Sequence, residues 1–306
     1  MNILISSVGL ETSVNLIRYF KKEGDTVTGM DINPYGYTSG SILADKYEQG
    51  AIPMAPDYID KVCEIIKKND IDIFIPNNDF EVLKISQNID KIPCKCVIPD
   101  FDTVNIIRDK LVCSQRIGEL GFKVPSFLNK EDGGNKILRE RVSVGSKGIT
   151  YYSNGAIVPV FDPGTSFLQK TIKGQEYTVD ILADKDGTPL YIVPRKRIEV
   201  KSGIATKVSI EKDDELIGEV KKLLESIKLP GFSNIQFMKD DDNVNWFVEI
   251  NGRFSGAGAA TLATCPGYLK TYKQVCDGTL SDKTFNKDVK WGSVVTRYYE
   301  ETVYTG

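Results

Sequence analysis

The stretch NWFVEINGRFSGAGAAT, residues 245–261, places an acid, an amide and a guanidinium two residues apart at the end of an apolar run. Its first seven residues have the composition of a β-strand. Because the side chains of a strand point alternately to its two faces, we expect Phe247, Glu249 and Asn251 to share one face. Arg253 follows just beyond the end of that strand.

The preceding apolar run, NIQFM at 234–238, is predicted to pair with this strand across the polar turn DDDN. The pairing would bring Gln236 onto the face of Glu249 and Asn251, so that three side chains with oxygen atoms able to bind a metal ion lie together. One carboxylate and two amides form a donor set that suits Mg²⁺. A salt bridge from Arg253 would also neutralise Glu249, and the strand alone does not choose between these two interpretations.

Composition limits the chemistry and the partners of the protein. The 306 residues include no histidine, which excludes Ser-His-Asp and Cys-His catalysis and histidine-ligated zinc. Lys and Arg number 39 against 42 Asp and Glu, and no basic stripe points to nucleic acid as a partner. No signal peptide or apolar run of about 18 residues is visible, so we expect a cytoplasmic protein that does not enter a membrane.

The first third of the chain alternates predicted strands and helices. Strands are expected at 3–6, 26–31, 71–76 and 94–100, and helices at 10–23, at 57–68 and from about residue 80. This order predicts a parallel sheet covered by helices. Asp31 ends the second strand where a dinucleotide fold carries its ribose-binding acid. SSVGLET (6–12) has a single glycine, however, which argues against NAD binding.

The remainder is predicted to hold two β regions separated by a crossing segment. Helix 109–121 leads into short, glycine-punctuated β segments across 124–172. A hairpin centred on Asp186-Gly187 then opens an antiparallel sheet, on which a helix at 213–227 packs.

A glycine-containing loop interrupts the first of these β regions. In VSVGSKGI (142–149) two glycines flank a serine and a lysine, a composition that allows backbone and side-chain donors to reach phosphate oxygens. Arg139 and Arg141 alternate just before it and would project toward the same anion. A plain hairpin turn explains the same residues, so both interpretations stay open.

The segment SFLQKTIKGQEYTVDIL (166–182) crosses between the two β regions. Glu176 follows Gln169 by seven residues. Backbone groups of such a crossing can contact an adenine edge, and a nearby carboxylate can accept ribose hydroxyls. An ordinary linker is the alternative.

In this order, these segments resemble the ATP-grasp superfamily, and more closely its carbamoyl-phosphate-synthase-like branch of carboxylate-amine ligases. The resemblance runs from the opening Rossmann-like region, through Asp109-Lys110 and GFKVP (121–125), to RYYEE at 297–301. Its most specific element is Gln236 followed by the E-x-N-x-R series that starts at Glu249.

The resemblance implies an ATP-grasp fold of mixed α/β and α+β class. Its parts would be a Rossmann-like pre-ATP-grasp domain at 1–108, a linker helix with a small β-rich lid at 109–172, and a C-terminal antiparallel-sheet domain with the metal site at 173–306.

The resemblance also implies roles for individual residues. ATP phosphates would be contacted by Lys110 and Arg139 and covered by a mobile loop of Gly145, Ser146, Lys147 and Gly148. The adenine site would be lined by Gln169, Lys170 and Ile172, and the ribose would be held by Glu176. Mg²⁺, or Mn²⁺ in its place, would be bound by Gln236, Glu249 and Asn251. Charge on the transferring γ-phosphoryl group would be stabilised by Arg253.

The chain departs from the family pattern at four positions. Arg139 stands where lysine is common, Glu140 replaces a proline, Gln169 replaces a glutamate, and Gly252 replaces the proline of the commoner E-x-N-P-R.

The implied activity is that of an ATP- and Mg²⁺-dependent ligase that activates a small carboxylate, such as an amino acid, as an acyl phosphate and transfers it to an amine. Arg195 and Arg197 are candidates for holding the substrate carboxylate. Two alternatives stay open, a kinase that stops at the phosphorylated carboxylate or amide, and a nucleotide-binding module without turnover. The expected partners are a small carboxylate and an amine, and the resemblance is compatible with a homodimer.

Overall fold

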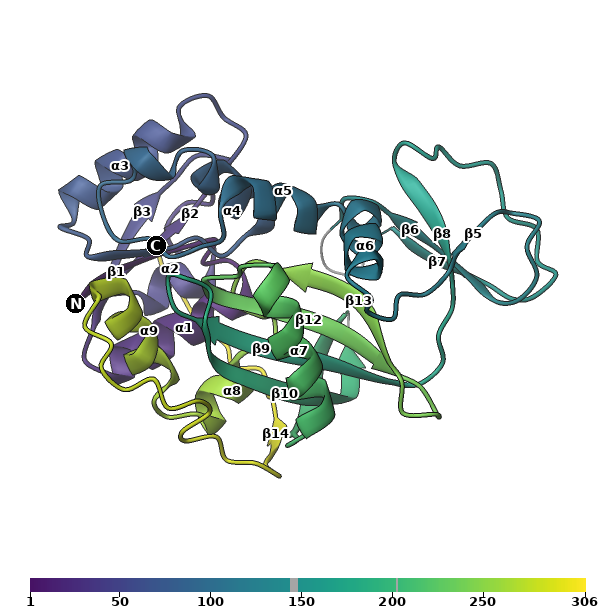
Figure 1. The fold of residues 1–306 in the computed structure, drawn as a ribbon. Coiled ribbons are helices and arrows are strands. Elements are labelled where there is room, and N and C mark those ends of the chain that lie inside the picture. The colour runs from purple at the N-terminus through teal and green to yellow at the C-terminus, as the bar shows by residue number, and fades with distance from the viewer. Residues whose placement is uncertain (144–147, 202) are drawn as a thin grey trace.

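The computed structural model describes residues 1–143, 148–201 and 203–306, so Gly145, Ser146 and Lys147 of the predicted loop lie outside the described residues. In the described part of the chain the strands form three sheets, and in Figure 1 the N-terminal sheet lies above the largest sheet and the small sheet lies to the right. None of the helices there has the length and apolar character needed to span a bilayer.

The N-terminal sheet is parallel, with strand order β3-β2-β1-β4. Its strands are β1 (Asn2–Ser6), β2 (Thr26–Asp31), β3 (Lys46–Gln49) and β4 (Ile73–Ile75). Its helices are α1 (Glu11–Lys22), α2 (Ser39–Leu43), α3 (Tyr58–Lys68) and α4 (Asp79–Ser86). The predicted parallel sheet is confirmed. Because β2 and β4 flank β1 on opposite sides, the carboxyl end of β1 is the point where the strand order reverses.

The prediction of a strand at 94–100 is wrong. The segment forms only an isolated bridge, in which Lys95 pairs with Ile73. Pro93 and Pro99 flank the bridge and lack the N–H groups that a longer ladder requires. The helix that follows, α5 (Phe101–Arg108), was not predicted, and it leads directly into α6 (Lys110–Glu119), which was.

The second sheet is small and antiparallel, with strand order β5-β8-β6-β7. Its strands are β5 (Phe127–Leu128), β6 (Lys136–Glu140), β7 (Ile149–Tyr152) and β8 (Ser166–Lys170). Figure 1 shows this sheet in teal, standing out beyond α6. The predicted β-rich character of 124–172 is confirmed, while the exact domain boundaries stay predictions.

The third sheet is the largest, with order β13-β12-β9-β10-β11-β14. Its strands are β9 (Gln175–Ala183), β10 (Pro189–Lys201), β11 (Ile204–Ile210), β12 (Gly231–Lys239), β13 (Asn245–Asn251) and β14 (Val294–Thr296). Helices α7 (Asp214–Ser226), α8 (Ala259–Thr264) and α9 (Tyr268–Asp277) complete this part of the chain. The hairpin of β9 and β10 and the pairing of β12 with β13 are confirmed.

A β-bulge corrects the predicted faces of β13. Gln236 pairs with Glu249, but the next pair is Phe237 with Phe247, which leaves Val248 as the extra residue. The prediction that Phe247 shares the face of Glu249 is therefore wrong. Phe247 is buried and packs edge-on against Phe237 in the core under α7.

The N-terminal and C-terminal regions share one hydrophobic core. Ile3, Leu16 and Phe20 belong to the same buried cluster as Phe232 and Tyr268. The chain beyond β14 returns to the N-terminal region, where Arg18 pairs with Glu300 and Tyr304 packs edge-on against Tyr35. The two regions are therefore held together both by packing and by the C-terminal segment.

Candidate active site

A cavity of about 600 Å³ is lined by residues of the two antiparallel sheets and of the segments that follow β1 and β4 in the N-terminal region. Gly148 and Arg141 do not line it, but the other described residues predicted to form the site do: Lys110, Arg139, Gln169, Lys170, Ile172, Glu176, Arg195, Arg197, Gln236, Glu249, Asn251 and Arg253. Some of these residues lie nearly half the chain apart in the sequence. The fold brings them to one cavity, whereas the sequence linked them only through separate motifs.

The predicted metal ligands lie next to one another on β12 and β13. Gln236 stands opposite Glu249, and Asn234 stands opposite Asn251. The Asn251 side-chain amide donates to the side-chain oxygen Oδ1 of Asn234 at 3.2 Å and to the Glu249 carboxylate at 3.4 Å. In the described part of the chain no three Asp, Glu, Cys or His side chains gather as a metal-binding group, so a cation here would depend on amide oxygens as well as Glu249.

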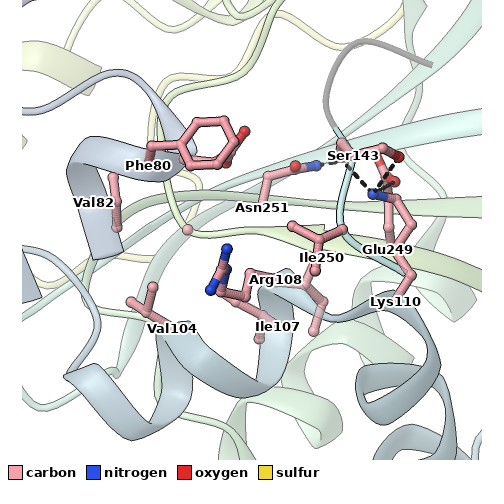
Figure 2. A pocket seen from close by; sticks show the side chains of 13 residues that line it. Phe80, Val82, Val104, Ile107, Arg108, Lys110, Ser143, Glu249, Ile250 and Asn251 are labelled. Atoms are coloured by element: carbon pink, nitrogen blue, oxygen red, sulfur yellow. Dashed lines mark hydrogen bonds and ion pairs between the residues drawn. The ribbon is translucent and has the colours of Figure 1, made fainter. Parts of the chain in front are cut away.

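Two cations face Glu249 from other elements. Its carboxylate lies 3.9 Å from the Lys110 amine and 3.6 Å from the Arg139 guanidinium. Lys110 also donates to the backbone oxygen of Ser143 at 2.7 Å, and Figure 2 shows this side chain between Ser143 and Glu249. Burial lowers the pKa of both Lys110 and Arg139, although Glu249 acts in the opposite direction.

The substitution of glutamine for glutamate at position 169 has a structural explanation. The buried Gln169 accepts a hydrogen bond from Arg139 at 3.1 Å and donates one to the backbone oxygen of Pro125 at 3.3 Å. A glutamate carboxylate could accept from Arg139 but could not donate to Pro125. The amide therefore satisfies both neighbours at this position.

The candidate ribose ligand is paired with a candidate substrate ligand. Glu176 on β9 accepts a hydrogen bond from Arg197 on β10, and Arg197 also donates to the backbone oxygen of Gly203 at 2.8 Å. Burial raises the pKa of Glu176, while the Arg197 charge acts to lower it. Both side chains line the cavity, so a ligand group that binds Glu176 or Arg197 must displace the other residue of this ion pair.

Arg195, a candidate ligand of the substrate carboxylate, is already bound to other side chains of the protein. Its guanidinium, 1% exposed, donates to both oxygens of Asp180 at 2.7 and 2.8 Å and to the Ser255 hydroxyl at 2.6 Å. Thr261 of α8 donates to the same Asp180 carboxylate. Arg195 therefore joins β9, β10 and the chain after β13, and only its Nη1 lacks a partner among the described residues.

The predicted catalytic arginine pairs with the N-terminal region. Arg253 donates to both oxygens of Asp79, at 2.9 Å each, and Asp79 begins α4. Burial acts to lower the pKa of Arg253, but the charge of Asp79, its hydrogen bond to Arg253 and the charge of Glu249 together raise the pKa. The sequence alternative in which Arg253 pairs with Glu249 is thus not the arrangement observed.

Two predictions about the phosphate loop concern described residues. Gly148 has φ +67° and does not line the cavity, and a Cβ there would lie 2.2 Å from the Glu140 side chain, so glycine is required by the turn. The prediction that Arg141 faces the same anion as Arg139 is wrong. Strand β6 ends at Glu140, and Arg141 instead pairs with Asp109 at 2.6 Å.

The N-terminal region contributes residues to the cavity that were not predicted. Leu10 and Thr12, after β1, and Asn77, Asn78 and Asp79, after β4, all line it. A signal was available, since polar residues that follow a buried parallel strand lie at the sheet edge where ligands bind in such folds. Asp31 does not take part; it accepts a hydrogen bond from the Gly9 amide at 2.8 Å and closes the β1–α1 turn.

Comparison with known families matches two segments of the chain. Residues 163–285 match a family described as ATP-grasp in the biosynthetic pathway with Ter operon, and residues 3–98 match the PylC-like N-terminal domain. The large chain of carbamoyl phosphate synthase from Clostridium acetobutylicum is 24% identical over 226 residues, 65% of this chain. The match spans about a fifth of that relative, 21% of its length.

Solved structures share the fold over nearly the whole chain. Biotin carboxylase from Campylobacter jejuni, in complex with an ATP analogue, has a TM-score of 0.75 at 16% identity, covering 96% of this chain and 74% of its own. N5-carboxyaminoimidazole synthetase from Staphylococcus aureus, with ADP, has 0.73 at 16%, covering 92% and 79%. L-amino acid ligase from Bacillus licheniformis has 0.71 at 12%, covering 96% and 78%.

Proposed function

Because this chain belongs to the ATP-grasp superfamily, in its carbamoyl-phosphate-synthase-like branch, we propose that it is an ATP- and Mg²⁺-dependent carboxylate-amine ligase. The substrate carboxylate attacks the γ-phosphorus of ATP and ADP leaves. The amine then attacks the carbonyl carbon of the acyl phosphate and inorganic phosphate leaves. The observation that carries the proposal is the convergence of the predicted nucleotide, metal and catalytic residues on one cavity.

The donors of the cavity fit the two groups that this reaction needs. Gln236, Glu249 and Asn251 offer oxygen atoms on neighbouring strands, the donor type that Mg²⁺ prefers. Arg139 carries a buried Nε without a hydrogen-bond partner among the described residues, which fits an anionic oxygen of a phosphate. When bound, Mg²⁺ would neutralise charge on the phosphate oxygens.

The protein's own residues supply positioning and electrostatics. Lys110 and Arg139, both largely buried, keep two positive charges beside Glu249 in a part of the cavity that is shielded from water. Arg253 lines the same cavity, where it pairs with Asp79, and it would stabilise negative charge that develops on the transferring group once it turns from Asp79 toward that group. No step requires an imidazole, which agrees with a chain without histidine.

An ADP-release assay with a matrix of small carboxylates and amines tests this function. A ligase releases ADP and forms an amide only when both substrates are present. ADP release with a carboxylate alone, together with a stable acyl phosphate, would indicate the kinase alternative. Saturable ATP binding without turnover in every combination would indicate the binding module.

The assembly state belongs to the same proposal. We propose a homodimer, and light scattering of the purified protein at several concentrations tests it. A mass near the 34.1 kDa of one chain at all concentrations would contradict it.

A further inference from the structure

A second, narrow cavity of about 40 Å³ adjoins the main one between α4, α5 and the chain after β13 (Figure 2). Both cavities are lined by Asp79, Lys110, Ser143, Glu249 and Asn251. The narrow cavity, or side pocket, therefore lies beside the candidate metal ligands. Its volume has room for roughly three water-sized groups.

The side pocket is apolar on the side formed by α4 and α5. Phe80 and Val82 come from α4, and Val104 and Ile107 come from α5. Figure 2 shows these side chains gathered around the space that Arg108 enters. A ligand group that lies against these four side chains would be small and apolar, because a larger group exceeds the volume and a polar group would lose hydrogen bonds to water there.

Two opposite charges line the same space. Arg108 ends α5, and no ion pair or hydrogen bond links its guanidinium to any other residue in the part of the chain that the structure describes. Asp79 begins α4 and contacts Arg253. A free guanidinium recognises a carboxylate, and a carboxylate recognises an ammonium group.

The charges of the main cavity favour Asp79 as an amine-binding group. Its lining includes three acids, Asp79, Glu176 and Glu249. The proposed function uses Glu176 for ribose and Glu249 for the metal ion, which leaves Asp79. If Arg253 turns toward the γ-phosphoryl group, as the proposed function requires, the Asp79 carboxylate is released for another cation.

Gly252, where relatives of the E-x-N-P-R pattern carry proline, forms part of this wall. A Cβ at Gly252 would lie 3.1 Å from Ile107 Cδ1 and 3.3 Å from Pro99 Cγ. Glycine thus lets the chain after β13 lie close to α5 where it lines the side pocket. A side chain here would push Ile107 toward the pocket or the backbone away from it.

We propose that the amine substrate is an α-amino acid with a small apolar side chain, and that it binds at the junction of the side pocket and the main cavity, with only its side chain inside the pocket. Its ammonium group pairs with Asp79, its carboxylate pairs with Arg108, and its side chain lies against Val82 and Val104. The inference rests on the proposed function, since the bound amine is the acceptor of that ligase. It also predicts that nucleotide binds before the amino acid, because Asp79 is paired with Arg253 until then.

Binding measurements test the pocket without any turnover. The full-length protein is saturated with Mg²⁺ and a non-hydrolysable ATP analogue and titrated by calorimetry with alanine, phenylalanine, methylamine and propionate. Alanine should bind at least about tenfold more tightly than the other three, since only alanine offers both charges and a small side chain. Without nucleotide, alanine should bind at least about tenfold more weakly.

Variants locate the binding in the side pocket. R108Q and V104F should each weaken alanine binding at least about tenfold while nucleotide binding changes by less than about threefold. D102N, an exposed change on the same helix α5, is the matched control and should bind alanine as the parent does. Alanine binding that is unchanged in R108Q, or absent in the parent protein, would overturn the proposal. If V104F does not fold, R108Q alone decides.

A second readout separates this inference from the proposed function. Hydroxylamine, which lacks a carboxylate, traps an activated carboxylate as a hydroxamate. In R108Q the ratio of amide formed with alanine to hydroxamate should fall at least about tenfold. If the parent protein forms neither product with any carboxylate, the ligase proposal fails, while the alanine titration still decides whether the pocket binds an amino acid.

Discussion

Arg253, just after the edge strand β13 of the large sheet, forms a two-point ion pair with Asp79 at the start of α4, 174 residues earlier in the chain. Both side chains line the main cavity, and the pair joins the region of the candidate metal ligands to the N-terminal region. A residue predicted to meet the γ-phosphoryl group is thus held by a carboxylate from the N-terminal region.

This pair should contribute measurably to stability. A double-mutant cycle with D79N and R253Q, followed by urea denaturation, is expected to give a coupling free energy of about 1–2 kcal/mol, since the pair is bidentate and partly buried. The exposed pair Arg18–Glu300 is the matched comparison and should give less than about 0.5 kcal/mol. Equal coupling free energies for the two pairs would show that the contact between Asp79 and Arg253 stabilises the fold no more than an exposed ion pair does.

Glu249 should be essential for turnover but not for folding. In E249A the predicted metal site loses its only carboxylate, so Mg²⁺-dependent kcat/KM is expected to fall about 100-fold or more. Circular dichroism should show the parent's helix and strand content. E199A, which removes a half-buried glutamate of the same sheet that does not line the cavity, should keep the parent's activity. Full activity in E249A would rule out the metal assignment.

Arg195 should matter for stability whatever its role toward the substrate. R195M leaves the Asp180 carboxylate buried without its partner, which is expected to lower the free energy of unfolding by about 3–5 kcal/mol. The double variant D180N/R195M removes both charges and should recover part of that loss. If R195M and the parent protein have the same urea midpoint of unfolding, the contacts that Arg195 makes with Asp180 and Ser255 do not stabilise the fold.

The pH dependence of stability should reveal the environment of Glu176. Its pKa is raised above the ordinary 4.5 by burial, so over the interval above pH 4.5 the folded state holds a proton that the unfolded state has lost. Stability should therefore fall as pH rises through that interval. In E176Q this part of the slope should disappear. Parallel curves of unfolding free energy against pH for the two proteins would show that the pKa of Glu176 is the same in both states.

Gly252 should resist substitution, whereas a glycine inside a helix should tolerate it. G252A places a Cβ against Ile107 and Pro99, and we expect it to lower the free energy of unfolding by about 1–2 kcal/mol. Gly218 lies inside α7, and a Cβ there would meet no atom within 4 Å, so G218A should raise that free energy by about 0.5–1 kcal/mol. Thermal denaturation of the two variants measures both effects. A neutral G252A would mean that Ile107 moves aside freely.

Much of the fold and of the cavity was accessible from the sequence because both depend on local patterns. Apolar periodicity predicted the N-terminal βαβ units, and strand alternation with the DDDN turn predicted that Gln236 would stand beside Glu249. The order of motifs then indicated which residues share a site. The departures were also local in origin: a bulge at Val248 turned Phe247 into the core, and prolines confined the 94–100 segment to a single bridge.

Only the tertiary structure decided how the charges are paired. The sequence determined that Arg253, Arg195 and Glu176 would occur on strands or just after them, but Asp79, Asp180 and Arg197 became their partners through contacts between elements. The side pocket depends on the same kind of contact, since α5 was not predicted and Gly252 had no neighbour until Ile107 and Pro99 were placed against it. Strand periodicity fixes the direction of a side chain within its own segment, whereas an ion pair or a pocket requires the relative positions of segments far apart in the chain.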